Sequence, residues 1–322
     1  MPLTALTGPT ATRILGLGHY RPSNVVTNQD LIARGGLDTD DEWIRTRVGV
    51  AERRWADPDE TVIDMAEAAG SKALAASGVA TADVDLVIVA SCTMPTPVPA
   101  AAPQLASRLS IAAPGAFDVN SGCSGFVYAL NIASSAVLAG QARNALVVAS
   151  ERFSGWLDLT DRSTSIILAD GAAAAVVGPS DVVGLGPVVW GSDGAQYDTV
   201  AIDEHTLMFR QEGQAVYRWA TGQMAAVALQ ACERAGVAAE DLAAFIPHQA
   251  NVRIIDAIAR RLGAPDMLVA RDIVTSGNTS AATIPLAFSR MLEGGQIPSD
   301  APVLLLGFGS GLAYAGQVVL AP

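Results

Sequence analysis

Cys123 stands where a reactive thiol could be presented to a ligand. It lies in the segment SGCSG, between a short apolar stretch at 115–119 and an apolar helical stretch that continues to residue 135. Small neighbours let a strand turn sharply into a helix and leave the corner side chain accessible. The unpaired N–H groups at the start of such a helix favour the thiolate and can stabilise an oxyanion on a bound carbonyl. We interpret Cys123 as a candidate nucleophile; the alternative, a buried structural cysteine, is our interpretation of Cys92 and Cys232.

Two neutral hydrogen-bonding side chains occupy comparable positions later in the chain. His248, in PHQAN, ends an apolar stretch, and Asn278, in SGNTSAA, has the glycine-flanked surroundings of Cys123. A neutral imidazole and an amide can both donate hydrogen bonds without carrying charge. Opposite a thioester-forming cysteine, they would suit the negative oxygen that forms when a carboxylated substrate loses CO2. Taken alone, His248 could equally be a satisfied core histidine and Asn278 an ordinary turn residue.

A glycine-rich segment, LLLGFGSGLAYAG, follows the last long apolar stretch and contains Phe308, Gly309 and Ser310. Its backbone N–H groups could bind an oxyanion, although a plain tight turn would have the same composition. The glycine spacing is not that of a dinucleotide-binding loop, and no acidic residue follows at the required place.

The elements that must position these residues occur twice in the chain. ASGVATADVDLVIVAS (76–91) resembles RAGVAAEDLAAFIPHQ (234–249), with Gly78 and Gly236 separated by 158 positions (236 − 78). Short β-branched runs alternate with alanine-rich helical stretches throughout, which indicates an α/β fold with buried strands. Such a repeat predicts two similar halves, 1–178 and 179–322, packed so that equivalent strand ends meet. Cys123 and Asn278 would then face one another.

Composition limits the classes of function. The chain has 322 residues, a net charge of −12 and a hydrophobic content of 50%. The negative charge argues against a nucleic-acid or anionic-membrane partner. Three dispersed cysteines predict no disulfide framework, and the absence of a signal-peptide pattern and of long apolar runs predicts a cytoplasmic protein. No metal site is expected.

Four motifs together resemble those of a known family. GCSGF, PHQAN, GNTSAA and GFGSGL occur in the order and spacing of the β-ketoacyl-[acyl-carrier-protein] synthase III family, a branch of the thiolase-fold condensing enzymes. Further matches are DEWIRTRVGV at 41–50 and DLTDRSTSIILADGAAAAVV at 158–177, so the resemblance covers nearly the whole chain. It implies a thiolase-like fold of two duplicated βαβαβαββ halves in a five-layered α-β-α-β-α arrangement, and a homodimer.

The resemblance also implies a ping-pong condensation. Cys123 would take an acyl group from acyl-CoA, and His248 and Asn278 would stabilise the enolate formed when malonyl-acyl carrier protein loses CO2. The thioester oxyanion would lie against the amides of Cys123 and Ser310, with Phe308 beside the decarboxylation site. Acyl-CoA is then a substrate, and no permanently bound cofactor is expected.

Positions for binding the two carriers follow from the same resemblance. The coenzyme A site would use an indole stacked on adenine opposite an arginine; its residues are Trp43, Arg162, Arg47, Thr39, Asn251 and Gly213. The docking surface for acyl carrier protein would be a basic face on two helices; its residues are Arg218, Arg253, Arg260 and Arg261.

Three departures from the family pattern affect the predicted substrate. Val98 stands where many bacterial members have a phenylalanine that reaches the partner subunit's acyl pocket, so we expect branched primers or primers longer than acetyl. Ser310 replaces a usual glycine but keeps the backbone N–H. The loop at 191–214 is shorter than usual, with Gln214 where Asn is common, so the sequence does not define its pantetheine contacts. Asn278 is retained, which favours carbon–carbon bond formation over simple acyl transfer.

Other functions are compatible with parts of this pattern. A starter-unit ketosynthase of an aromatic polyketide pathway would have the same catalytic residues, and a ketosynthase-III-like acyltransferase would form an ester instead. A biosynthetic thiolase would need a second cysteine in the glycine loop, where GFGSG has none. A cysteine hydrolase and an inactive partner subunit are the remaining alternatives.

Overall fold

Two five-stranded sheets form the framework of the protein. The computed structural model describes residues 6–322, and within them the first sheet has the strand order β1-β7-β6-β4-β5 and the second the order β12-β11-β13-β14-β8. The strands of the first sheet are β1 (Ala11–Tyr20), β4 (Val84–Ala90), β5 (Gly115–Val119), β6 (Asn144–Arg152) and β7 (Asp170–Ser180). Those of the second are β8 (Val189–Gly191), β11 (Ala244–Pro247), β12 (Leu268–Val269), β13 (Pro302–Phe308) and β14 (Tyr314–Leu320).

The two sheets have the same topology. Read from the other edge, the second sheet runs β8-β14-β13-β11-β12, and every neighbouring pair has the parallel or antiparallel direction of its counterpart in the first sheet. The register agrees as well: Leu86 pairs with Ala145, and Ala244 pairs with Val303, each 158 positions later (244 − 86 and 303 − 145). We propose that the chain divides into two duplicated halves, 1–178 and 179–322. The last strand of the first half, β7, extends two residues past this boundary, to Ser180.

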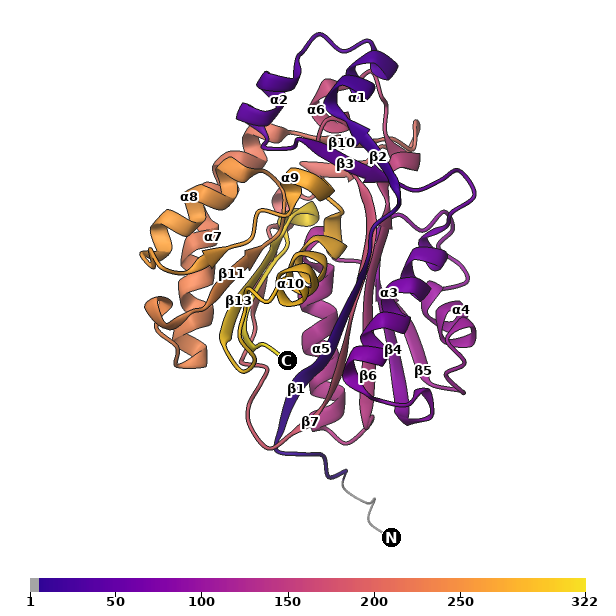
Figure 1. Cartoon of the computed structure of the whole chain (residues 1–322), viewed down its shortest axis with the longest axis vertical. Helices are drawn as coiled ribbons and strands as arrows, with labels where there is room; N and C mark the ends of the chain where they lie inside the picture. Colours follow the sequence, from indigo (N-terminus) through magenta and orange to yellow (C-terminus); the bar gives the residue numbers. More distant parts are fainter. Residues whose placement is uncertain (1–5) are drawn as a thin grey trace.

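Helices complete a five-layered arrangement (Figure 1). The central layer, α5 (Gly125–Leu138) and α10 (Thr283–Glu293), packs between the sheets in one apolar cluster. The outer layers are α3 (Val62–Ser77) and α4 (Ala101–Arg108) on the first sheet, and α7 (Gly213–Ala235) and α8 (Val252–Leu262) on the second. A helix packed between two sheets is largely shielded from water, and α5 accordingly has no charged residue, with only Ser135 and Leu138 exposed.

A smaller group of elements covers one end of the sheets, at the top of Figure 1. It has its own apolar cluster, which includes Leu31, Ile44, Trp55 and Phe153. Its helices are α1 (Asn28–Gly35), α2 (Asp41–Arg47) and α6 (Arg162–Ser165), with α9 (Ile273–Ser276) beneath them. Its strands form two antiparallel pairs: β2 (Asn24–Thr27) with β3 (Glu52–Trp55), which are separated in the chain by α1 and α2, and the hairpin β9 (Val200–Ile202) with β10 (Phe209–Gln211).

Arg53 is a buried charge within this smaller group of elements. Its side chain is completely buried, and its guanidinium donates to Oδ1 of Asn28 (2.7 Å) and to the carbonyls of Ile166 (2.9 Å) and Val26 (3.4 Å). Burial lowers the pKa of Arg53 to about 10, so the side chain stays protonated at neutral pH. Within residues 6–322 no carboxylate bonds it directly: its two terminal nitrogens donate to neutral oxygens, and its Nε is buried without a hydrogen-bond partner.

Replacing Arg53 should therefore destabilise the fold. Arg53→Leu leaves several buried acceptors without a donor, and we expect a loss of about 2–4 kcal/mol in the free energy of unfolding. The neighbouring Arg54→Leu, which loses a partly exposed ion pair with Glu52 and a long hydrogen bond to the carbonyl of Ser23 (3.4 Å), should cost less than about 1 kcal/mol. Urea denaturation followed by circular dichroism measures both, and equal losses for the two variants would contradict this account.

Candidate active site

The corner that carries Cys123 has the expected strand-to-helix form. β5 ends at Val119, a 3-10 turn spans Gly122–Ser124, and α5 begins at Gly125. Gly122 has φ +48°, and a Cβ built on it would lie 2.8 Å from Cβ of Ser310. The turn therefore requires glycine both for its backbone conformation and for the close approach of the C-terminal loop.

Cys123 opens onto a cavity between the two halves of the chain. The cavity has a volume of 190 Å³ and is lined by Cys92, Asn120, Gly122, Cys123, Phe153, Val200, Ala201, Ile202, Phe209, Ser280 and Ser310. Oγ of Ser280 donates to Sγ of Cys123 at 3.5 Å. The β9–β10 hairpin, within the 191–214 segment, supplies one apolar wall of this cavity.

The ionisation of Cys123 differs from the prediction. We expected the helix N-terminus to favour the thiolate, but burial raises the pKa of the Cys123 thiol to about 11. The hydrogen bond from Ser280 and the backbone amides of Cys123 and Ser310 lower this pKa, as anticipated, while Glu151 raises it. Desolvation outweighs the donors, and the resting group at neutral pH is a thiol. The same two amides point toward the sulfur and are placed to receive an oxyanion.

Asn278 reaches this region from the second half. Gly277, at φ +74°, precedes it, and a Cβ there would lie 2.6 Å from that of Ala169. The Asn278 backbone is bonded to the first half, because its N–H donates to Ile167 and its carbonyl accepts from Ala169, each at 2.9 Å. Oδ1 of Asn278 accepts the N–H of Ser280 at 2.7 Å. Its NH2 group is therefore the end left to donate to a ligand.

His248 follows β11 and is almost completely buried. Its Nδ1 lies 2.8 Å from Oγ1 of Thr283, and its ring meets the edge of Phe308 at a centroid distance of 5.4 Å and an angle of 80°. Burial lowers the pKa of His248 to about 3. The imidazole is therefore neutral at physiological pH, in agreement with the chemistry expected of it.

Ser280 brings the three predicted residues together. Its hydroxyl bonds Cys123, its N–H bonds Asn278, and its carbonyl lies 2.8 Å from the hydroxyl of Thr283, which in turn lies 2.8 Å from Nδ1 of His248. Cys123 therefore lies beside the turn that carries Asn278, as the repeat predicted. His248 and Asn278 do not line the 190 Å³ cavity, since they are only 2% and 6% exposed behind Ser280.

The glycine-rich loop lies against the sulfur. A Cβ on Gly309 would be 2.9 Å from Sγ of Cys123, so this position admits only glycine without displacing the thiol. Ser310 follows, and its hydroxyl donates to the carbonyl of Val200 at 2.8 Å, which ties the loop to the β9–β10 hairpin. Phe308 is buried between the rings of His248 and Trp219.

Two groups near the thiol were not recognised from the sequence. Cys92, interpreted there as structural, lines the cavity, lies 3.6 Å from Oγ of Ser280 and donates its S–H to Glu151. Glu151 is fully buried and also accepts from Ser91 and Thr93. Burial raises the pKa of Glu151, and these donors lower it. The only sequence signal was an acidic residue at the end of the apolar run ALVVASE.

The residues predicted to bind coenzyme A lie at the covered end of the sheets. The Arg162 guanidinium sits 4.8 Å from the ring centroid of Trp43, whose exposed fraction is 36%. Trp43 and Arg162 therefore contact each other directly, with nothing between them. Asn251 uses its side chain to begin α8, accepting from the N–H of Arg253 and donating to the carbonyl of Arg47. Thr39 has a buried hydroxyl without a hydrogen-bond partner.

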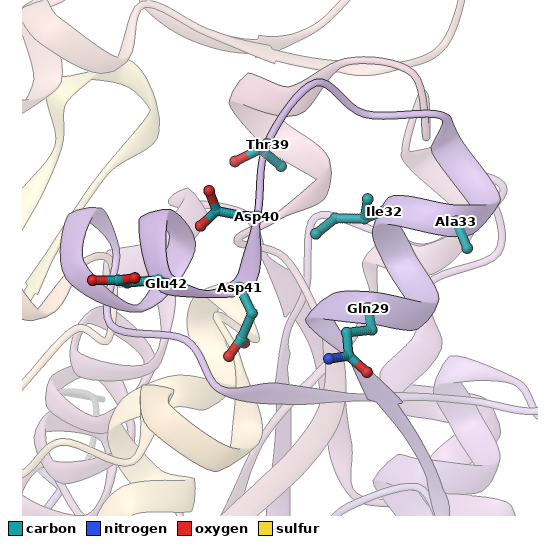
Figure 2. Close-up of a pocket in the computed structure, with 7 residues that line it drawn as sticks. All are labelled: Gln29, Ile32, Ala33, Thr39, Asp40, Asp41 and Glu42. Atoms are coloured by element: carbon teal, nitrogen blue, oxygen red, sulfur yellow. The ribbon is translucent and has the colours of Figure 1, made fainter.

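A hollow between α1 and α2 adjoins these residues but has the wrong charge for a phosphorylated ligand (Figure 2). Its volume is 600 Å³, and its lining consists of Gln29, Ile32, Ala33, Thr39, Asp40, Asp41 and Glu42. Asp40 already accepts the N–H of Trp43, and Asp41 pairs with Arg45. Three carboxylates along one wall would repel the phosphates of coenzyme A.

The predicted docking arginines gather where α7 and α8 lie side by side. Arg218 and Arg253 line a pocket of 310 Å³ with Gly213, Gln214 and Tyr217. The Arg253 guanidinium lies 5.4 Å from the ring centroid of Tyr217. Arg260 and Arg261 are exposed near the end of α8. In the described part of the chain, no group of three or more His, Cys, Asp or Glu side chains is arranged to hold a metal, and no helix is long and apolar enough to cross a membrane.

The raised pKa of Cys123 predicts slow alkylation at neutral pH. The thiolate fraction should grow about tenfold for each pH unit between 7 and 10, and the rate of reaction with iodoacetamide should follow it. Peptide mass spectrometry over time measures Cys123 separately from Cys92. Ser280→Ala removes a donor to the sulfur and should slow the reaction further at each pH. A rate that is already constant above pH 8 would contradict the burial of this thiol.

Comparisons with known proteins agree with the geometry. Residues 117–194 match the family described as 3-oxoacyl-[acyl-carrier-protein (ACP)] synthase III, and residues 232–320 match the C-terminal part of that family. Beta-ketoacyl-[acyl-carrier-protein] synthase III 4 of Streptomyces coelicolor is 50% identical over 314 residues, which cover 97% of this chain and 99% of that one. A mycobacterial beta-ketoacyl-[acyl-carrier-protein] synthase III of Mycobacterium avium is 42% identical, with 99% and 98% covered.

Solved structures have the same fold over the full length. The priming β-ketosynthase from the R1128 polyketide biosynthetic pathway superimposes with a TM-score of 0.96 and 42% identity, covering 100% of this chain and 99% of that one. The 3-oxoacyl-(acyl carrier protein) synthase III of Pseudomonas aeruginosa PAO1 gives 0.91 and 38%, with 97% and 98% covered. The thiolase-like fold predicted from the sequence is confirmed. With identities of this size over nearly the whole chain, the protein belongs to the 3-oxoacyl-[acyl-carrier-protein] synthase III family of acyltransferases.

Proposed function

We propose that the protein condenses an acyl-CoA primer with malonyl-acyl carrier protein by way of an acyl-cysteine. Sγ of Cys123 bonds to the primer carbonyl, the bond from that carbon to the coenzyme A sulfur breaks, and coenzyme A leaves with the thiol proton. Malonyl thioester then loses CO2, its carbanion forms the new carbon–carbon bond, and the bond to Cys123 breaks. The single observation that carries this proposal is the position of Ser280, bonded both to the thiol and to the turn bearing Asn278.

The neutral donors support the decarboxylation step. His248 is uncharged at neutral pH and can donate one N–H. Asn278 has its side-chain oxygen bonded by the N–H of Ser280, so its NH2 group is left to donate to the enolate oxygen. Uncharged donors in a dry site stabilise an oxyanion without trapping it as an ion pair. The amides of Cys123 and Ser310 would serve the thioester oxygen in the same way, with Phe308 beside His248.

The two carriers would approach from the covered end of the sheets. In this proposal coenzyme A inserts its adenine between Trp43 and Arg162, with Arg47 and Thr39 nearby. Asn251 and Gly213 would lie along the path from there to Cys123. Malonyl-acyl carrier protein would dock on the exposed arginines of α7 and α8. The net charge of −12 would repel an acidic carrier protein at long range, but physiological salt screens that repulsion. At short range, the positive charge of these arginines would attract the carrier.

The acyl group that the enzyme accepts as primer is a further part of the proposal. Val98 is 80% exposed in the single chain and does not line the cavity beside Cys123. In a homodimer, which we propose, this loop would reach the partner's acyl pocket. The edge strand β5 supports such a pairing, since it leaves Phe117 39% exposed. A valine occupies less of the pocket than a phenylalanine, and we therefore propose branched or longer primers for fatty-acid initiation.

A starter-unit ketosynthase of a polyketide pathway is the second candidate. It is favoured by the TM-score of 0.96 to the R1128 priming enzyme, above the 0.91 to the Pseudomonas synthase. Both functions use the same chemistry at Cys123 and differ in the carrier protein. A higher kcat/KM with malonyl carrier protein of a polyketide pathway than with that of fatty-acid synthesis would select the second candidate.

Asn278→Ala should separate the two half-reactions. Acyl loading on Cys123 should stay within about twofold of the parent protein, whereas CO2 release from labelled malonyl-acyl carrier protein should fall about 100-fold or more, because a donor to the enolate is lost. Intact-mass analysis measures loading, and trapped radioactivity measures decarboxylation. Cys123→Ala is the control that loads no acyl group. Loss of loading in Asn278→Ala would mean that its role is wrongly assigned.

A panel of acyl-CoA primers tests the interpretation of Val98. Isobutyryl or longer acyl groups should load on Cys123 at least as fast as acetyl in the parent protein, by intact-mass analysis at short times. Val98→Phe should reduce loading of these larger groups and leave acetyl within about twofold, since only the larger groups need the space. Strict preference of the parent protein for acetyl would refute the interpretation.

A further inference from the structure

We propose that the hydroxyl of Thr283 selects the tautomer of His248 in which Nε2 carries the proton, and so makes the imidazole a donor to the enolate oxygen. Thr283 would then be a positioning residue, which acts through His248 and touches no substrate. The inference deepens the proposed function and rests on it for the identity of the acceptor. The tautomer itself is a property of the free protein.

The contact between the two side chains is short and dry. Nδ1 of His248 lies 2.8 Å from Oγ1 of Thr283, and each residue is only 2% exposed. A neutral imidazole has one N–H proton. Which nitrogen carries this proton depends on the hydrogen-bond partner of the other nitrogen. In residues 6–322 the Thr283 hydroxyl is the only hydrogen-bond partner of Nδ1, so the orientation of that hydroxyl decides the tautomer of His248.

The hydroxyl has two acceptors within reach. It can donate to the carbonyl of Ser280 at 2.8 Å, in which case Nδ1 must carry the ring proton, or it can donate to Nδ1 and leave the proton on Nε2. The Ser280 carbonyl already accepts the backbone N–H of Thr283. Turning the hydroxyl toward His248 therefore leaves no buried group without a hydrogen bond.

The other ring nitrogen is the one available to a ligand. Nε2 has no hydrogen-bond partner within residues 6–322, yet it is not among the fully buried nitrogen and oxygen atoms that lack one. It therefore keeps a small accessible surface. A lone pair at Nε2 would repel an enolate oxygen, whereas an N–H would bind it. The edge of Phe308 holds the ring plane, so the two tautomers differ in proton position and not in ring orientation.

Nuclear magnetic resonance of ¹⁵N-histidine-labelled protein tests the tautomer directly, because the chain has three histidines. In the parent protein Nδ1 of His248 should have the chemical shift of an unprotonated nitrogen and Nε2 that of a protonated one. Thr283→Val should mix the two forms, and Thr283→Ser should restore the parent spectrum. A protonated Nδ1 in the parent protein would overturn the proposal, whether or not the valine variant folds.

Single-turnover kinetics provide the functional measurement. In Thr283→Val, CO2 release from malonyl-acyl carrier protein should fall about 10- to 100-fold while acyl loading on Cys123 is unchanged, and Thr283→Ser should recover most of the loss. Thr279→Val is the matched control, since that buried hydroxyl has no hydrogen bond to lose. Unchanged decarboxylation in Thr283→Val would overturn the proposal. Failure of the parent protein to load acyl groups would instead refute the proposed function and leave the spectrum interpretable.

Discussion

The site depends on one residue, Ser280, held in a conformation that serine rarely adopts. Its φ is +49°, in the left-handed region, which costs a non-glycine residue about 1–2 kcal/mol. In this conformation the hydroxyl contacts Cys123 and Cys92, the N–H holds Asn278, and the carbonyl accepts from Thr283. The surrounding hydrogen bonds offset the strain, and they fix in one place groups that come from both halves of the chain.

The duplicated topology explains why these groups can meet. Because the two sheets pack against the same central helices, α5 and α10, the turns that open those helices lie side by side at one end of the molecule. Cys123 belongs to the first of these turns and Asn278 to the turn before the second. The backbone bridge between Leu168 and Asn278 joins the halves at this level. The asymmetry of the proposed site, with the thiol on one side and neutral donors on the other, arises from different side chains on similar backbones.

The sequence predicted the parts of this arrangement that are local or periodic. The repeat predicted the facing turns, and the small residues around Cys123 predicted its corner. The sign of the Cys123 pKa shift was wrong, because desolvation depends on packing by the β9–β10 hairpin and the C-terminal loop, which lie far away in the chain. Cys92, Glu151 and Thr283 were missed for a related reason. Each becomes significant only through a side-chain contact with a residue distant in the chain, and residue type alone does not reveal it.

The crystal structure of the protein acylated on Cys123 is the most direct measurement of the central claim. We expect the thioester oxygen to accept hydrogen bonds from the amides of Cys123 and Ser310. We also expect Nε2 of His248 and the NH2 of Asn278 to face the volume in front of the acyl carbon. An acyl-enzyme whose carbonyl turns away from those amides, or whose His248 and Asn278 are sealed off from the acyl carbon, would contradict that claim.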